Sequence, residues 1–154
     1  MDSDTYNYAW ESSYMRNSVC TKFKNCISSD LTNSIINCTK YTNNTGGSDA
    51  SSESYVTATS DYIFLLAEFE VFGSCRYANS YEQNKQQQYS YFANGNSKIF
   101  YRYNSADTTC PWFLRSPAIY SMTPISCCLV STTGTISNNC SYISSGFAPA
   151  FVIG

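Results

Sequence analysis

The chain has 154 residues, a length that suits one ordinary domain with its own hydrophobic core. Charged residues make up only 13% of it and the net charge is −2, which argues against electrostatic binding to nucleic acid or to an anionic membrane. Histidine is absent, and this excludes Ser–His and Cys–His nucleophile pairs together with every histidine-ligated metal site.

The N-terminal part of the chain predicts one or two helices. Apolar residues recur at spacings of mostly four from Glu11 to Ile27, as on one face of an amphipathic helix. These residues are Tyr14, Met15, Val19, Phe23 and Ile27. Ser28-Ser29-Asp30 then provides a helix stop and a new N-cap, and a short segment follows at 31–36.

The next part predicts short strands around one helical turn. Thr42–Glu53 is a polar loop, and Ser54–Thr59 alternates as a strand does. Tyr62–Leu66 is an apolar run typical of a buried strand. Ala67–Gly73 is expected to be a helical turn that ends at its glycine.

Residues 77–117 are more polar. A helix is predicted near Glu82–Tyr91, a turn at Asn94–Asn96 and a strand at Ser97–Tyr103. Pro111–Pro117 is an apolar piece that ends at a proline.

The C-terminal part predicts a hairpin, with strands at Cys127–Val130 and Thr135–Ser137 joined by a turn that contains Gly134. Phe147–Ile153 is expected to be an apolar terminal strand. Helices early in the chain and short strands late indicate a single α+β domain over residues 1–154.

The sharpest change in composition lies at Arg115, because every Lys, Arg, Asp and Glu lies at or before it. The uncharged stretch Pro117–Gly146 is either buried, as a central hairpin or an oligomer contact, or exposed as a contact surface. Burial suits its hydroxyl and amide groups poorly, since each buried polar group needs a partner. The abundance of Tyr, Ser, Asn and Thr resembles an antibody paratope, and equally a Tyr-rich β protein with a neutral surface.

Several residues are better explained by structure than by chemistry. Arg115, between apolar residues and a proline, is predicted to pair with a buried carboxylate such as Glu68 or Glu70. Glu68 and Glu70 are not expected to form a catalytic pair, because residues i and i+2 of a helix do not share a face. Trp112 is predicted to lie in the core.

Eight cysteines occur without a C-x-x-C motif, so a zinc ribbon or a thioredoxin-like site is not expected. Buried free thiols are favoured over disulfides. Cys127 and Cys128 are adjacent, and in a strand they would point to opposite faces. No metal and no other cofactor are predicted.

Three motifs, taken in order, resemble an uncharacterised domain family of gut bacteria and their phages: Asp61–Gly73, Trp112–Pro117 and Gly146–Phe151. Tyr14-Met15-Arg16 and Lys40-Tyr41-Thr42 are also similar, and the resemblance covers most of the chain. That family resembles the C-type-lectin-like fold shared by formylglycine-generating enzymes and the phage major tropism determinant. The residues expected to form its fixed scaffold are Trp112, Arg115, Glu68, Glu70 and Pro149.

Two departures from that family are visible. Its members usually carry more sequence ahead of the equivalent of Trp10, so this chain is expected to be the C-terminal part of a longer protein, and a partner for the C-terminal strand is in doubt. Phe113 stands where a second Trp is common.

Some members look like variable proteins of diversity-generating retroelements, in which mutagenesis at adenines rewrites a C-terminal segment, typically at AAY codons. After mutation at its two adenines, such a codon still ends in a pyrimidine and cannot encode Lys, Gln, Glu, Met or Trp. Between Ala118 and Ser145 the only such residue is Met122, which would be a fixed position. A Ser/Thr-rich loop and hairpin is the plainer explanation of this restricted alphabet.

The resemblance therefore implies a variable ligand-binding segment at 117–146. Its expected contact residues are Ala118, Ile119, Tyr120, Ser121, Thr123, Ile125, Ser126, Cys127, Leu129, Ser131, Thr133, Thr135, Ser137, Asn138, Asn139, Cys140, Tyr142, Ile143 and Ser145.

The favoured function is a receptor-binding domain without enzymatic activity, on a phage tail fibre or a bacterial cell surface. Its expected partner is a protein or glycan receptor on a cell, with no nucleic acid and no membrane insertion, and with a homo-oligomer (a trimer if fibre-borne) as the assembly. No apolar run approaches the roughly 20 residues of a membrane span, and no signal peptide is visible.

Two alternatives stay open. The first is a formylglycine-generating-type oxidase, in which Cys110 with Cys127 or Cys128 would be the reactive pair. The second is a structural oligomerisation module of a virion, with the uncharged segment as its contact.

Overall fold

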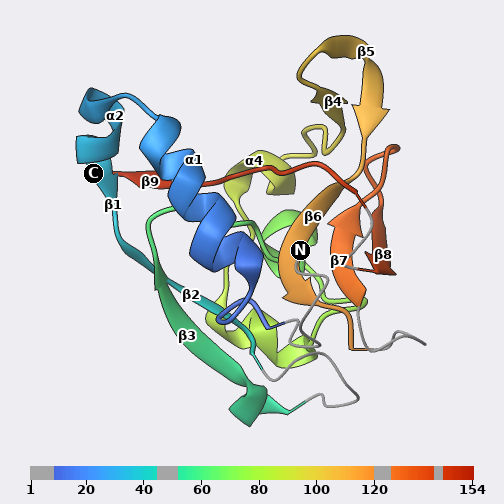
Figure 1. Ribbon diagram of the computed structural model, residues 1–154. Helices are drawn as coiled ribbons and strands as arrows, with labels where there is room; N and C mark the ends of the chain where they lie inside the picture. The colour runs from blue at the N-terminus through green and yellow to red at the C-terminus, as the bar shows by residue number, and fades with distance from the viewer. Residues whose placement is uncertain (1–8, 45–51, 120–125, 141–143) are drawn as a thin grey trace.

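The computed structural model describes residues 9–44, 52–119, 126–140 and 144–154. In these residues, short helices surround small antiparallel sheets, which confirms the α+β class (Figure 1). Among the described segments, no helix combines the length and the apolar character needed to cross a bilayer.

The first predicted helix is present as a π-helix, η1 (Met15–Cys20), that continues into α1 (Thr21–Cys26). Met15 and Cys20 are buried five residues apart, as the i→i+5 turns of a π-helix require. Tyr14 is exposed, so its expected place on the apolar face is wrong. Val19, Phe23 and Ile27 pack against the same hydrophobic cluster as Met15, so the predicted spacing of four is confirmed for these residues.

The second helix, α2 (Ser29–Ser34), begins after Ser28 as predicted. It leads into β1 (Ile35–Ile36), which pairs antiparallel with β9 (Val152–Ile153). The C-terminal strand therefore has a partner within this chain. It is shorter than expected, because from Phe147 to Phe151 the only bridge is the one between Ala150 and Phe64.

Strands β2 (Cys38–Asn43) and β3 (Val56–Asp61) form a regular two-stranded sheet, seen at the lower left of Figure 1. Strand β2 extends into the predicted polar loop, whose residues 45–51 lie outside the described residues. A 3-10 turn, η2 (Glu53–Tyr55), precedes β3.

The run Tyr62–Leu66 is buried at Ile63, Phe64 and Leu65 as expected, but it is an extended segment with one bridge rather than a strand. Helix α3 (Glu68–Phe72) follows and ends at Gly73, whose φ of 68° confirms the predicted glycine stop.

The predicted helix Glu82–Tyr91 is wrong. A 3-10 helix, η3 (Ser80–Lys85), and one turn of α4 (Ser90–Ala93) are separated by extended residues. In this gap the amide of Gln86 donates to the carbonyl of Tyr41, and the amide of Gln88 donates to the carbonyl of Val71. Contacts with remote backbone thus replace the helix.

Strands β4 (Phe100–Arg102) and β5 (Ser105–Cys110) form an arm that projects from the body, at the top of Figure 1. Strands β6 (Trp112–Pro117), β7 (Ser126–Val130) and β8 (Ile136–Cys140) form a sheet in that order. The predicted hairpin is confirmed, and its turn carries Gly134 at φ 78°.

The central strands β6 and β7 separate two hydrophobic clusters. Phe113, Cys127 and Leu129 face the first cluster, which includes residues from the N-terminal helix. Trp112 and Cys128 face the second, which packs under α3 and α4. Because adjacent residues of a strand point to opposite sides, this arrangement confirms the predictions for Trp112 and for the Cys127-Cys128 pair.

Candidate ligand-binding site

Five of the expected contact residues are buried. The side chains that the structure encloses are those of Ala118, Ile119, Ser126, Cys127 and Leu129. They cannot form an exposed contact surface here, and the expectation is corrected for them. Ser126, Cys127 and Leu129 lie on β7, the middle strand of its sheet, which has a hydrophobic cluster on each face. Ala118 packs in the second cluster, and the backbone N–H of Ile119 donates to the carbonyl of Tyr77.

Eight other expected contact residues reach the surface. Thr133 and Thr135 are exposed in the β7–β8 turn. The half-buried members of the predicted set are Ser131, Ser137, Asn138, Asn139, Cys140 and Ser145. The remaining members lie outside the described residues: Tyr120, Ser121, Thr123, Ile125, Tyr142 and Ile143, with Met122 among them.

A cleft of about 610 Å³ lies between the arm and the segment that follows β8. We name it the aromatic cleft. One side of the cleft is formed by residues 100–104 of the arm, and the opposite side by residues 144–147. Cys110 and Pro111, which directly precede β6, also line it. It thus brings one predicted residue, Ser145, together with arm residues that the sequence analysis did not single out.

The base of the aromatic cleft is firmly built. The ring of Phe100 stacks on that of Trp112 with centroids 4.6 Å apart, and the indole N–H of Trp112 donates to the carbonyl of Lys98. The Gly146 N–H donates to the carbonyl of Pro111 over 2.7 Å. A Cβ atom at Gly146 would lie 3.0 Å from that carbonyl oxygen, so the close approach of the two segments favours glycine.

The walls of the aromatic cleft are open to solvent. The side chain of Tyr101 is 56% exposed and that of Tyr103 is fully exposed. Arg102 is exposed, and no ion pair or hydrogen bond to its guanidinium occurs among the described residues. No Asp or Glu is found among the described residues that line the cleft. The cleft therefore combines aromatic surface with one uncompensated positive charge.

The exposed turn lies beside the arm. A Cβ atom on Gly134 would meet the Ile99 side chain at 3.2 Å, and Ile99 directly precedes β4. Thr133 and Thr135 therefore flank the base of the same arm that walls the aromatic cleft. The only sequence signal for these arm residues was the excess of tyrosine.

Behind this surface, the predicted anchor is confirmed. The two Nη atoms of Arg115 donate to the two carboxylate oxygens of Glu70 over 2.6 and 2.9 Å. Arg115 also donates to the Leu65 carbonyl and to the Thr42 hydroxyl, and Lys40 lies 3.3 Å from Glu70. Burial alone would raise the pKa of Glu70, but Arg115 and Lys40 outweigh it and hold that pKa below its ordinary value.

Glu68 has a different partner. Its carboxylate accepts hydrogen bonds from the backbone N–H groups of Arg76, Tyr77 and Ala78, so it ties the loop after α3 to the core. Glu68 and Glu70 thus serve separate contacts, as their helical spacing predicts. Pro149, the last expected scaffold residue, is half-buried between Ala148 and Ala150, which pack on the two clusters.

A third buried carboxylate was not anticipated. Glu82 is fully buried and accepts from the Asn43 N–H, the Ser116 hydroxyl and the Gln86 amide. Burial raises the pKa of Glu82 above its ordinary value despite these donors. On the outer side of this polar network, beside Lys40 and Gln86, the surface has a hollow of about 440 Å³.

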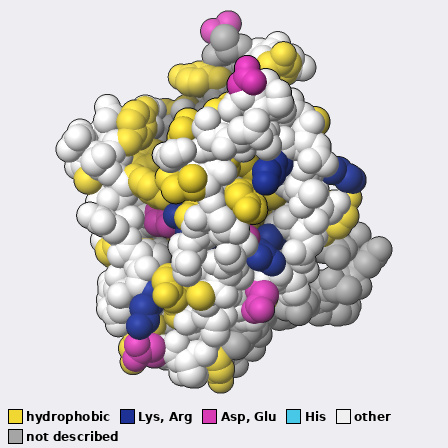
Figure 2. Space-filling view, turned by 90° about the vertical axis from the view of Figure 1, so that its left-hand side faces the viewer, with side chains coloured by type: hydrophobic (Ala, Val, Ile, Leu, Met, Phe, Trp, Pro, Cys, Tyr) yellow, Lys and Arg dark blue, Asp and Glu magenta, His cyan; other side chains and the backbone are white. Residues whose placement is uncertain are grey.

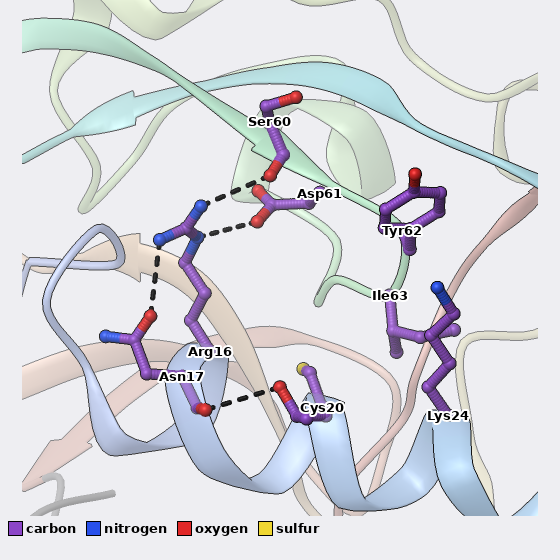
Figure 3. Close-up of a pocket in the computed structure, with 9 residues that line it drawn as sticks. Arg16, Asn17, Cys20, Lys24, Ser60, Asp61, Tyr62 and Ile63 are labelled. Atoms are coloured by element: carbon purple, nitrogen blue, oxygen red, sulfur yellow. Dashed lines mark hydrogen bonds and ion pairs between the residues drawn. The ribbon is translucent and has the colours of Figure 1, made fainter.

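A smaller hollow, of about 290 Å³, lies between α1 and the end of β3 (Figure 3). There Arg16 pairs with Asp61 at 2.6 Å and also donates to the carbonyl of Ser60, while Lys24 stands 3.5 Å from the centroid of the Tyr62 ring. Burial raises the pKa of the Cys20 thiol to about 12. Because Arg16 is already paired and the Cys20 thiol stays protonated, we interpret the residues of this hollow as structural rather than as a reactive or binding site.

All eight cysteines are free thiols, but only Cys20, Cys127 and Cys128 are fully buried, and Cys26 is exposed. Burial raises the pKa of Cys127 to about 12 and that of Cys128 well above its ordinary value. A reactive thiol needs the opposite shift of its pKa.

The charges on one face of the molecule are dispersed (Figure 2). On the face turned to the viewer in Figure 2, Lys and Arg side chains stand apart from one another, with acidic side chains and uncharged surface between them. Among the described residues, no cluster of three or more Cys, Asp or Glu side chains is arranged to hold a metal ion.

Comparison with known proteins places the whole chain in one family. No curated protein and no solved structure matches it. The sequence pattern of the DUF6273 family, a domain of unknown function, matches residues 1–154. The chain therefore belongs to the DUF6273 family.

Proposed function

We propose that this domain binds a receptor on a cell surface, through the aromatic cleft and the exposed part of the uncharged C-terminal segment. The observation that carries the proposal is the arm itself. It presents two exposed tyrosines over a cleft, together with an exposed arginine that has no ion-pair partner among the described residues.

The division between frame and surface supports this proposal. The Arg115–Glu70 ion pair and the two hydrophobic clusters hold β6 and β7 in place. The exposed side chains of the arm and the turn extend from that frame, and Phe100 connects the arm to it by stacking on Trp112. Contact residues on a rigid frame are the common arrangement in binding domains, and Tyr and Ser are the residues such surfaces favour.

The finer parts of the proposal rest on the resemblance of the sequence motifs. We propose a C-type-lectin-like fold and a variable protein of a diversity-generating retroelement, on a phage tail-fibre tip or a bacterial surface. Variation is then expected at Thr133, Thr135 and Ser137, and not at the five buried positions. The raised pKa values of Cys127 and Cys128 give an oxidase no support.

Binding of the fluorescently labelled protein to intact bacterial cells tests the proposal. The protein is applied to a panel of Gram-negative and Gram-positive gut isolates, and bound fluorescence is measured by flow cytometry. We expect saturable binding to at least one isolate and its loss in the double variant Tyr101→Ala, Tyr103→Ala. Tyr91→Ala is the matched control, because Tyr91 on α4 is also 56% exposed but lies away from the cleft.

Two results would overturn the proposal. One is the absence of saturable binding to every isolate in the panel. The other is binding that the double variant retains in full, since the aromatic cleft would then have no part in it.

A further inference from the structure

We infer that the ligand of the aromatic cleft is an acidic saccharide, with the sugar carboxylate on Arg102 and sugar rings against the tyrosines of the arm. This inference rests on the proposed function, and it names the chemistry of the ligand at the same site.

The size of the cleft suits a short saccharide. Its volume of about 610 Å³ falls within the range of roughly 300–1,000 Å³ that small-ligand sites occupy. A protein partner needs about 800 Å² of surface on each side of a standard interface, and a cleft is not the form such an interface requires.

The charge of the cleft favours an anion. Arg16 and Arg115 each form an ion pair with a buried carboxylate, whereas Arg102 has no acidic partner within the described segments and no described Asp or Glu lines the cleft. A guanidinium presents paired N–H donors that match the two oxygens of a carboxylate. One arginine in a chain of net charge −2 is too little for a nucleic acid, whose binding depends on many phosphate contacts.

The other lining groups suit a sugar ring. A pyranose has a face of C–H groups and an edge of hydroxyl groups. The face of an aromatic ring is electronegative and attracts C–H groups, and the arm offers such faces at Tyr101 and Tyr103. Asn104 and Ser144 line the cleft and offer exposed hydrogen-bonding groups for the hydroxyl edge. Ser145 also lines the cleft, but its hydroxyl oxygen is buried and has no hydrogen-bond partner in the described part of the chain, so a sugar does not reach it in this conformation.

Paired acidic and neutral probes test the inference by isothermal titration calorimetry. The probes are trigalacturonate and its fully methyl-esterified form, together with sialyllactose and lactose. At least one acidic probe is expected to bind about tenfold more tightly than its neutral counterpart, since a charged hydrogen bond contributes about 1.5 kcal/mol or more.

Variants assign the effect to named side chains. Arg102→Gln is expected to bind the acidic and neutral probes of a pair equally, and Arg102→Lys to restore part of the preference. The double variant Tyr101→Ala, Tyr103→Ala is expected to lose both members of the pair. Arg76→Gln removes another exposed arginine outside the cleft and should leave binding unchanged.

The possible results distinguish a failure of the saccharide inference from a failure of the receptor-binding proposal. If no acidic probe binds while cell binding still depends on the two tyrosines, the saccharide inference is overturned and the receptor-binding proposal stands. Equal binding of acidic and neutral probes, or a preference that Arg102→Gln retains, also overturns the role of the carboxylate. Loss of the acidic preference in Arg102→Gln alone, with Arg76→Gln unchanged, supports it.

Discussion

Strands β7 and β8 belong to one hairpin and both lack charged residues, yet they differ in how far their side chains are buried. Both consist of uncharged residues. Every side chain of β7 is buried, while every side chain of β8 is half-buried. Strand β7 lies between two other strands, and β8 is the edge of the sheet in its described part.

The comparison shows what an absence of charge means in this chain. The uncharged stretch after Arg115 has two causes rather than one. In β7 it reflects burial between two hydrophobic clusters, and in the turn and β8 it is a property of accessible surface. The position of a strand in the sheet is not encoded in its residue types. It divides this region into a buried frame, formed by β6 and β7, and an accessible surface, formed by β8 and the arm.

The largest expected difference in the free energy of unfolding is between Arg115 on β6, in the frame, and Arg102 on the arm. Arg115→Met is expected to lower the free energy of unfolding by about 3–5 kcal/mol, because it removes one partner of a buried ion pair and leaves several acceptors unsatisfied. Arg102→Met, on the arm, should change it by less than about 0.5 kcal/mol. Urea unfolding followed by fluorescence measures both, and equal losses would break the distinction between frame and arm.

A pair of register partners makes the next comparison within one sheet. Leu129 on β7 and Ser137 on β8 lie opposite each other. Leu129→Ala should lower the free energy of unfolding by about 3 kcal/mol, since Leu129 is 4% exposed and a cavity would remain. Ser137→Ala is expected to change it by less than about 0.5 kcal/mol. A large loss in Ser137→Ala would assign β8 to the frame.

The pH dependence of the frame provides a smaller, signed effect. The raised pKa of Glu82 means that the folded protein keeps a proton that the unfolded chain releases, so stability falls as pH rises above the ordinary value of 4.5. Glu82→Gln removes this dependence. Urea unfolding at pH 5, 6 and 7 should show the variant gaining on the unaltered protein by at most about 1.4 kcal/mol per pH unit. Parallel curves for the two proteins would contradict the raised pKa.

The smallest effect is expected at the turn. The Thr133 hydroxyl lies within hydrogen-bond distance of the Ser131 hydroxyl, but the site is exposed and water can replace this contact. Thr133→Lys should therefore alter the free energy of unfolding by less than about 0.5 kcal/mol in thermal or urea unfolding. A loss near that of Leu129→Ala would mean that the turn supports the frame, and would remove it from the proposed surface.

The sequence by itself determined the features that local chemistry specifies. Spacing of apolar residues located the first helix, glycines located the end of α3 and the β7–β8 turn, and the setting of Arg115 indicated its buried carboxylate. These signals come from a few neighbouring residues, and the backbone geometry they favour does not depend on the rest of the chain.

Tertiary structure alone decided which uncharged residues are covered, where the predicted Glu82–Tyr91 helix breaks, and that a cleft exists. The helix breaks because Gln86 and Gln88 bond to carbonyls of β2 and α3. The cleft exists because Gly146 pairs with Trp112 and brings the C-terminal segment beside the arm. Each of these depends on partners distant in sequence, and no local pattern can carry that information.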